Sequence, residues 1–161
     1  MDYARYNLWA NRRIVELFAS LTEAQAEQHI ESSYPSVKRT MLHVWDAEVI
    51  WLSRLREAPI WEFPSKNFKG DFQTASAGLL ATSTEFLAQV EATAEADFAK
   101  ELSFSTITSG DYNHRVFEMI HHCMNHSTYH RGQLITFARQ LGLRDLPSTD
   151  MILYLREKNK V

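Results

Sequence analysis

Four of the seven histidines of this 161-residue chain lie in the segment HHCMNHSTYHRGQL, at positions 121–134. Three of them, His122, His126 and His130, recur at intervals of four residues. Because four residues advance an α-helix by about 400°, neighbouring imidazoles in this series are only about 40° apart around the helix axis. Two histidines at this spacing can bind one metal ion, each through one ring nitrogen. The segment therefore indicates a candidate metal site.

The spacing alone leaves a structural role equally open, because buried histidines often simply hydrogen-bond to carbonyl or carboxylate groups. No glutamate follows the first histidine of HSTYH, so the segment lacks the HExxH motif of zinc metalloproteases. Glu118 and His121 match the ExxH motif of di-iron bundles once, whereas those sites use the motif twice. Neither a zincin nor a ferritin-like centre is therefore expected.

A mononuclear site needs at least one more ligand, preferably from a facing helix. His43, in TMLHVWDAE, is the candidate because its segment is helical, whereas His29 and His114 lie near the ends of segments. The main apolar arc of that helix centres near Met41, Trp45 and Leu52, on the side opposite His43. Periodicity therefore does not place His43 in the interior of the protein.

Helical spacing of apolar residues dominates the chain, with modest connections between the segments. It predicts long helices over residues 2–20, 36–57, 74–97 and 113–141, and short helices that open at Thr22 and at either Thr149 or Asp150. The segment ELSFSTITSGDYNH, residues 101–114, alternates around a Ser-Gly-Asp turn and predicts a small hairpin or extended link. The pattern therefore predicts an all-α fold, a four-helix bundle with short accessory helices and a small hairpin.

Length and charge restrict the class of protein. A chain of 161 residues with 45% hydrophobic residues can fill one core, so we expect a single domain over residues 1–161. Its 17 basic and 20 acidic residues include no basic run, which argues against nucleic-acid and polybasic membrane contacts. The first residues lack a signal-peptide core, and the lone Cys123 cannot form an internal disulfide. We predict a cytoplasmic protein.

The second predicted long helix, residues 36–57, is apolar around most of its circumference. Met41, Trp45, Leu52 and Leu55 exceed what a single inward face buries, so they contact either the core or a second copy of the chain. We therefore predict a homodimer. A small molecule is the expected substrate, and neither nucleic acid nor a membrane is an expected partner.

Two motifs far apart in the chain carry a resemblance to a known family. SVKRTMLHVWDAEVIWLSRL, followed downstream by HCMNHSTYHRGQLITFARQLG, resembles the DinB-like (DinB/YfiT) family of metal-binding four-helix-bundle proteins. YNLWANRRIVELFASLTEAQ and STDMILYLRE extend the resemblance to nearly the whole chain. It implies an up-down-down-up bundle with a long crossover, frequent homodimers and a metal site at one end of the bundle. It also implies that His43, His126 and His130 are the three metal ligands.

Three neutral imidazoles would leave a divalent ion with open coordination positions, as in catalytic zinc sites. Zinc, nickel, iron and manganese all remain candidates for that single ion, because imidazole suits several transition metals. The resemblance suggests a metal-dependent enzyme, a transferase or isomerase that uses a low-molecular-weight thiol such as bacillithiol, mycothiol or glutathione. Two alternatives stay open: a non-catalytic metal-binding stress-response protein and, as the weaker one, a metal-dependent hydrolase.

We expect structural roles for the other side chains near the histidines. His122 is expected to form a wall of the pocket, Cys123 to pack in the core, and Arg131 to pair with a carboxylate such as Glu48 on another helix. No catalytic residue is identified, because the orientation of Asp46 and Glu48 does not follow from the sequence. No organic cofactor is expected.

Overall fold

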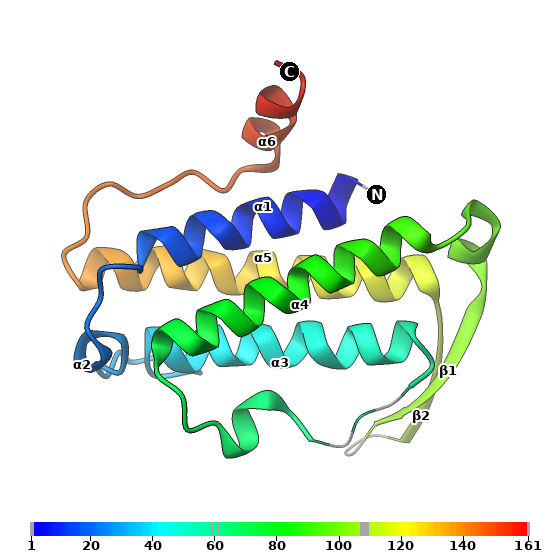
Figure 1. The fold of residues 1–161 in the computed structure, drawn as a ribbon, viewed down its shortest axis with the longest axis horizontal. Helices are drawn as coiled ribbons and strands as arrows, with labels where there is room; N and C mark the ends of the chain where they lie inside the picture. The colour runs from blue at the N-terminus through cyan, green and yellow to red at the C-terminus, as the bar shows by residue number, and fades with distance from the viewer. Residues whose placement is uncertain (1, 59, 61, 107–109, 161) are drawn as a thin grey trace.

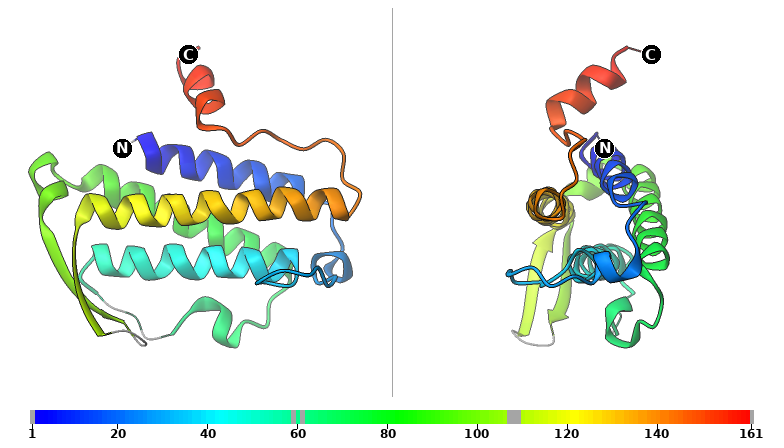
Figure 2. Two further views of the ribbon diagram at one scale, coloured as in Figure 1. Left: turned by 180° about the vertical axis from the view of Figure 1, so that it is seen from behind. Right: turned by 90° about the vertical axis from the view of Figure 1, so that its left-hand side faces the viewer.

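Four long helices dominate the computed structural model, which describes residues 2–58, 60, 62–106 and 110–160 (Figure 1). They are α1 (Asp2–Leu17), α3 (Val37–Leu55), α4 (Phe72–Ala92) and α5 (Val116–Gln140). Both α1 and α3 pack against α4 and α5, so α1 lies diagonally across from α3 (Figure 2). This arrangement confirms the four-helix bundle predicted from the sequence.

The direction of the helices follows the up-down-down-up order. α1 and α5 run one way along the bundle, whereas α3 and α4 run the other way (Figure 1). Parallel neighbours need a connection that returns along the bundle, and the segment between α3 and α4 provides it. A 3₁₀ helix in this crossover, η1 (Pro64–Asn67), packs against α3. The crossover therefore covers a side of α3 that the other three long helices leave open.

Side-chain caps explain where three of the helices begin. The Ser36 hydroxyl accepts a hydrogen bond from the Arg39 N–H at 3.1 Å, and the Asp71 carboxylate accepts one from the Thr74 N–H at 2.8 Å. Thr22 and Gln25 form a capping box that opens the short helix α2 (Glu23–Ala26). Each cap satisfies N–H groups that have no partner within the helix, and so fixes its start.

A two-stranded hairpin changes the predicted start of the last long helix. Strands β1 (Glu101–Thr106) and β2 (Gly110–Arg115) pair in antiparallel register, with Phe104 opposite Tyr112. Residues 113–115 belong to β2, so α5 begins at Val116 rather than at residue 113. The hairpin satisfies the backbone groups of these residues that a longer helix would otherwise use. The predicted hairpin itself is confirmed.

Two other predicted helices end early, because apolar side chains reach the core without being helical. α1 ends at Leu17 rather than at residue 20, yet Phe18 and Leu21 are buried in the core. α4 ends at Ala92 rather than at residue 97, where Thr93 becomes extended and a separate 3₁₀ helix, η2 (Glu95–Ala99), follows. Apolar spacing therefore overestimates helix length at chain reversals.

The core consists of two apolar layers along the bundle. The layer at the α2 end contains Phe18, Met41, Leu79 and Leu134, among others. The layer at the hairpin end contains Leu52, Phe86, Met119 and Met124, among others. Residues from the middle of the long helices separate these layers and are polar, as described below.

The apolar arc of α3 is covered by the chain itself. Met41, Leu52 and Leu55 are buried in the two core layers. Trp45 donates a hydrogen bond from its indole N–H to Thr82 Oγ1 at 2.9 Å. Its ring also lies so close to Gly78 that a Cβ there would come within 2.4 Å of it. Intrachain packing thus accounts for this arc, and the homodimer stays a prediction.

The last helix, α6 (Met151–Lys158), lies against the outer side of α1 (Figure 1). Its Tyr154 packs on Tyr6 and Trp9, and the Tyr6 hydroxyl donates a hydrogen bond to the Thr149 carbonyl at 2.8 Å. Asp150 precedes α6 as predicted, although its side chain makes no capping hydrogen bond. Among the helices of the described residues, none combines the length and apolar composition needed to cross a membrane.

Candidate metal site

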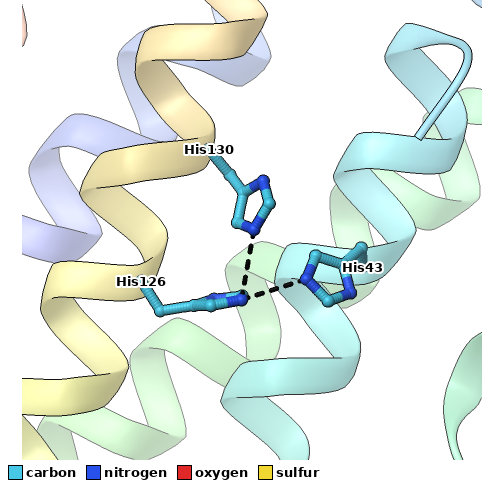
Figure 3. A group of neighbouring side chains, drawn as sticks. All are labelled: His43, His126 and His130. Carbon is cyan, nitrogen blue, oxygen red and sulfur yellow. Dashed lines mark hydrogen bonds between the residues drawn. The ribbon is translucent and has the colours of Figure 1, made fainter. Parts of the chain in front are cut away.

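Three histidines meet at the seam between α3 and α5. His43 projects from α3, and His126 and His130 project from successive turns of α5, toward one another (Figure 3). His126 Nε2 lies 3.0 Å from His43 Nε2 and 3.2 Å from His130 Nε2. We call these three residues the histidine cluster. The His43 side chain therefore points from α3 toward α5 and does not lie on the inward apolar face of α3. For this reason the apolar periodicity of α3 did not place His43.

The cluster lies beside the middle turns of α5, ten to fourteen residues after that helix begins at Val116. His43 lies six residues after α3 begins at Val37, and the site at one end of the bundle that the resemblance implied stays a prediction.

Burial keeps the histidine cluster uncharged at neutral pH. Loss of solvent, reinforced by the neighbouring rings, lowers the pKa of His43 to about 4 and the pKa of His126 to about 3. Burial also lowers the pKa of His130, whereas its hydrogen bond to Gln133 acts in the opposite direction. Neutral imidazole is the form that binds metal ions, so the folded chain presents these rings in the state that a metal requires.

Gln133 sets the tautomer of His130. His130 Nδ1 lies 2.7 Å from Gln133 Oε1, an oxygen that can only accept a hydrogen bond. The Gln133 amide nitrogen in turn donates to the Tyr129 hydroxyl at 3.4 Å, which is consistent with this orientation. A neutral His130 must therefore carry its hydrogen on Nδ1. Its Nε2 lone pair points at the other two rings.

Tyr34 supports His43 from the segment that precedes α3. The two rings stack with centroids 3.9 Å apart and an angle of 17° between their planes. The Tyr34 carbonyl accepts hydrogen bonds from Ser32 Oγ and Thr40 Oγ1, which fix the backbone on both sides of the ring. Neither Tyr34 nor Gln133 was identified from the sequence as a support. Gln133 lies three residues after His130, a spacing that could have suggested this contact.

The three rings are close enough to share one metal ion. All three ligand atoms lie within 4.8 Å of one another. Nitrogens bound at about 2.0–2.1 Å to a tetrahedral zinc ion are about 3.3–3.4 Å apart, close to the observed 3.0 and 3.2 Å. A hydrogen on His126 Nε2 could be donated well to only one of its two neighbours. A cation between the rings would instead accept a lone pair from each of them.

A pocket of about 330 Å³ opens beside the cluster. Its lining is mostly apolar or aromatic and also includes His43, His126 and Asp46. The walls comprise Ala47, Ile50 and Trp51 of α3, Phe63 of the crossover and His122 of α5. Ligand pockets typically combine an apolar lining with a few polar groups. This pocket can therefore hold a small molecule within reach of the histidines.

Asp46 anchors the crossover next to the pocket. One carboxylate oxygen accepts a hydrogen bond from the Ser65 N–H at 2.9 Å, and the other accepts from the Ser65 hydroxyl. Burial raises the pKa of Asp46, whereas these hydrogen bonds favour its charged form. Asp46 thus borders the pocket and holds η1 in place.

His122 and Cys123 do not join the histidine cluster. His122 is exposed and packs against Trp51 at a ring distance of 4.7 Å, so it forms part of the pocket wall as expected. Cys123 is fully buried in the core layer at the hairpin end, and burial raises the pKa of its thiol well above the usual value. The chain's own cysteine therefore remains a protonated core residue.

A second polar cluster lies at the centre of the bundle, between the two apolar layers. The Glu48 carboxylate is fully buried and accepts hydrogen bonds from all three other long helices. The donors are Asn7 and Asn11 of α1 at 2.7 and 2.8 Å, Ser83 of α4 at 2.5 Å and Ser127 of α5 at 3.3 Å. We call this group, together with Arg131, the Glu48 hub. Glu48 is therefore not directed toward the pocket.

Arg131 belongs to this hub but does not form the direct ion pair expected from the sequence. Its Nη1 donates to Asn7 Oδ1 at 2.6 Å and to Asn11 Oδ1 at 2.8 Å, and its Nη2 donates to Thr128 Oγ1 at 2.8 Å. The two asparagine amides therefore connect the guanidinium to the Glu48 carboxylate. Amides can bridge in this way because each offers both a donor and an acceptor.

A family model and a related protein of known name both point to the same family. The family model described as the DinB family matches residues 1–160. Protein DinB of Bacillus subtilis (strain 168) is 28% identical over 155 residues, which cover 93% of this chain and 90% of that protein.

Two crystal structures show the same fold at low sequence identity. A DinB-like protein from Bacillus cereus ATCC 10987 aligns with a TM-score of 0.69 and 20% identity, over 87% of this chain and 90% of that chain. A DinB-like protein, YjoA, from Bacillus subtilis aligns with a TM-score of 0.70 and 15% identity, over 93% of this chain and 98% of that chain. With the family model matching almost every residue, the chain belongs to the DinB family.

Proposed function

We propose that this protein binds one divalent transition metal ion through the Nε2 atoms of His43, His126 and His130. The convergence of three neutral imidazoles from two helices carries the proposal. Gln133 and Tyr34 hold two of the rings in the required orientation. Zinc, nickel, iron and manganese are the candidate metals, because a ligand set made only of imidazole does not choose strongly among them.

The reaction that we propose is a transfer or isomerisation that uses a small thiol, such as bacillithiol, mycothiol or glutathione. A metal held by three histidines supplies open positions that can bind and stabilise a thiolate. Cys123 is buried in the core, so a sulfur ligand has to come from a molecule in the pocket. Ala47, Ile50 and Trp51 would exclude water from one side of that molecule.

The alternative of a hydrolase fits the pocket less well. A hydrolase would need a general base next to the bound water. Asp46 is the carboxylate that borders the pocket, yet both of its oxygens already accept hydrogen bonds from Ser65. Glu48, the other candidate, lies in the centre of the bundle. The hydrolase therefore stays the weaker alternative.

Metal content tests the ligand assignment. We expect one metal ion per chain in the wild type, and a loss of stoichiometric metal when His126 and His130 are both replaced by alanine, with helical content unchanged. His121→Ala is the matched control, because His121 lies on the same helix but outside the histidine cluster. Full metal occupancy in the double variant would contradict the assignment.

Cobalt substitution tests the thiol. Cobalt-loaded protein should develop a thiolate charge-transfer absorption band when glutathione is added, and the His126→Ala variant should not. A metal site that leaves its spectrum unchanged with all small thiols tested would argue for the non-catalytic metal-binding alternative.

A further inference from the structure

Arg54 is a half-buried cation with no acidic partner in the described part of the chain. Its guanidinium carbon lies 4.4 Å from the ring centroid of Trp51 and 4.3 Å from that of Phe104. Neither a hydrogen bond nor an ion pair joins it to a described carboxylate. An arginine stays charged at any physiological pH, so the structure holds a positive charge here on an aromatic surface.

The carboxylates around this end of α3 already have other partners. Glu57 is 3.2 Å from Lys100 Nζ, and Glu118 accepts a hydrogen bond from the Arg115 N–H at 2.9 Å. Among the residues that the structure describes, no carboxylate pairs with the Arg54 guanidinium, which leaves its N–H groups available to an anion from outside the chain.

Arg54 lies on the face of α3 that lines the pocket. His43, Ala47, Ile50 and Arg54 are spaced by four, three and four residues, which places them within about 60° of one another around the helix. His43, Ala47 and Ile50 line the pocket, and the Trp51 ring beneath Arg54 does too. At about 1.5 Å per residue, the Cα of Arg54 lies about 16 Å along α3 from that of His43.

Residues of the opposite wall of the pocket also place Arg54 next to it. His122 lines the pocket from α5 and packs on Trp51. The guanidinium of Arg54 lies 4.4 Å from the centroid of the same Trp51 ring, so Trp51 contacts both His122 and Arg54. The pocket is thus lined by residues of the histidine cluster and by Trp51 and His122, and Arg54 adjoins it at the Trp51 ring.

We propose that Arg54 is a carboxylate-binding subsite of this pocket. The substrate would be an elongated molecule with a metal-binding group at one end, an apolar middle against Ile50 and Trp51, and a carboxylate at the other end. This inference rests on the proposed function, since it takes the histidine cluster as the anchor for the first end.

The chemistry of the subsite favours a carboxylate over a phosphate. A guanidinium presents parallel N–H groups that match the two oxygens of a carboxylate. A phosphate monoester carries nearly two negative charges at neutral pH, which one arginine would only partly balance. Stacking on Trp51 and Phe104 restricts the guanidinium, so less rotamer freedom is lost when an anion binds.

Matched thiol probes test the subsite on zinc-loaded protein. We would measure by calorimetry the affinity of 8-mercaptooctanoate and of its neutral amide, which differ only at the far end. The wild type should bind the acid at least about tenfold more tightly than the amide, a ratio typical of a charged hydrogen bond. Arg54→Gln should bind both probes equally, and Arg54→Lys should retain a smaller preference.

Two controls make the result specific. Arg56→Gln should keep the full preference, because Arg56 is exposed and pairs with Glu85 at 3.0 Å. The short 3-mercaptopropanoate should show no preference over its amide, because its carboxylate cannot extend to Arg54.

The outcomes separate the two proposals. Equal binding of the long acid and amide to the wild type would overturn the subsite while leaving the thiol site intact. An acid preference that survives Arg54→Gln would also overturn it. If neither thiol binds the zinc-loaded protein, the proposed function fails and this inference fails with it.

Discussion

The histidine cluster and the Glu48 hub are two polar groups that both use residues of α3 and α5, but their hydrogen bonds are satisfied to different degrees. In the hub, both oxygens of Glu48 accept hydrogen bonds from donors on the other helices. In the cluster, three ring nitrogens face one another, and at least the Nε2 of His130 has a lone pair pointing at its neighbours. The hub lies between two apolar layers, whereas the cluster borders a pocket.

The contrast indicates which polar group performs which role. A satisfied buried network fixes the relative position of the elements that contribute to it. Convergent lone pairs without donors are unfavourable by themselves and become favourable with a cation between them. Since His130 and Arg131 are neighbours in the sequence, the same turn of α5 contributes to both. The hub can thereby fix the position of that turn along the bundle, so that His130 lies close to His43.

Replacing Arg131 by methionine should have the largest effect on stability. The change leaves two buried asparagine oxygens without their donor and removes the positive charge that they connect to Glu48, and each unsatisfied buried group costs about 1 to 3 kcal/mol. Urea unfolding of the metal-free protein measures this directly. Arg139→Met, at an exposed site on the same helix, should change the free energy of unfolding by no more than about 0.5 kcal/mol.

The comparison also predicts that the Arg131→Met variant retains metal binding. The folded fraction of Arg131→Met should still bind one metal ion, because Arg131 does not contact the histidine cluster. A stability within about 1 kcal/mol of the wild type would show that the hub is not a structural requirement.

The sequence predicted the bundle well because caps and apolar periodicity are local signals. Ser36 and Thr22 were readable as caps from their neighbours alone. The ends of α1 and α4 were not, since Phe18 and Leu21 continue the apolar pattern after the chain has turned. The end of a helix depends on how its last residues pack against the rest of the core. The spacing of apolar residues along one segment does not contain that information.

The site was predicted in part for the same reason. The spacing of His126 and His130 along one helix shows that they share a face. The approach of His43 depends on the rotation of α3 against α5, so the family resemblance identified it while periodicity did not. The contacts of Tyr34 with His43 and of Arg54 with Phe104 were missed because they join residues of different segments.

Acid should destabilise the metal-free protein through the histidine cluster. Unfolded histidines titrate near pH 6.5, whereas the folded pKa values of His43 and His126 are about 4 and about 3. Below pH 6.5 the unfolded chain therefore binds protons that the folded chain does not, and the free energy of unfolding falls as the pH drops. Between pH 7.5 and 5 this loss should be about 2 kcal/mol, half of the full linkage value because both rings are partly exposed.

Urea unfolding at the two pH values, in the presence of a chelator, measures this loss. The double variant His43→Gln/His126→Gln should lack this part of the pH dependence, and His121→Gln should retain it. The same pH dependence in the wild type and the double variant would assign the acid sensitivity to the carboxyl groups instead.

The smallest expected effect concerns Gln133, the residue that connects the cluster to the rest of α5. Gln133→Leu removes the acceptor for His130 Nδ1–H and should weaken metal binding about tenfold, the lower end for losing a group that orients a metal-bound histidine. Gln133→Glu keeps an acceptor and should restore the affinity. Gln140→Leu, on an exposed turn of α5, is the control that should leave it unchanged. Competition with a chromophoric chelator measures all four proteins, and equal affinities for Gln133→Leu and the wild type would show that His130 is oriented by the helix alone.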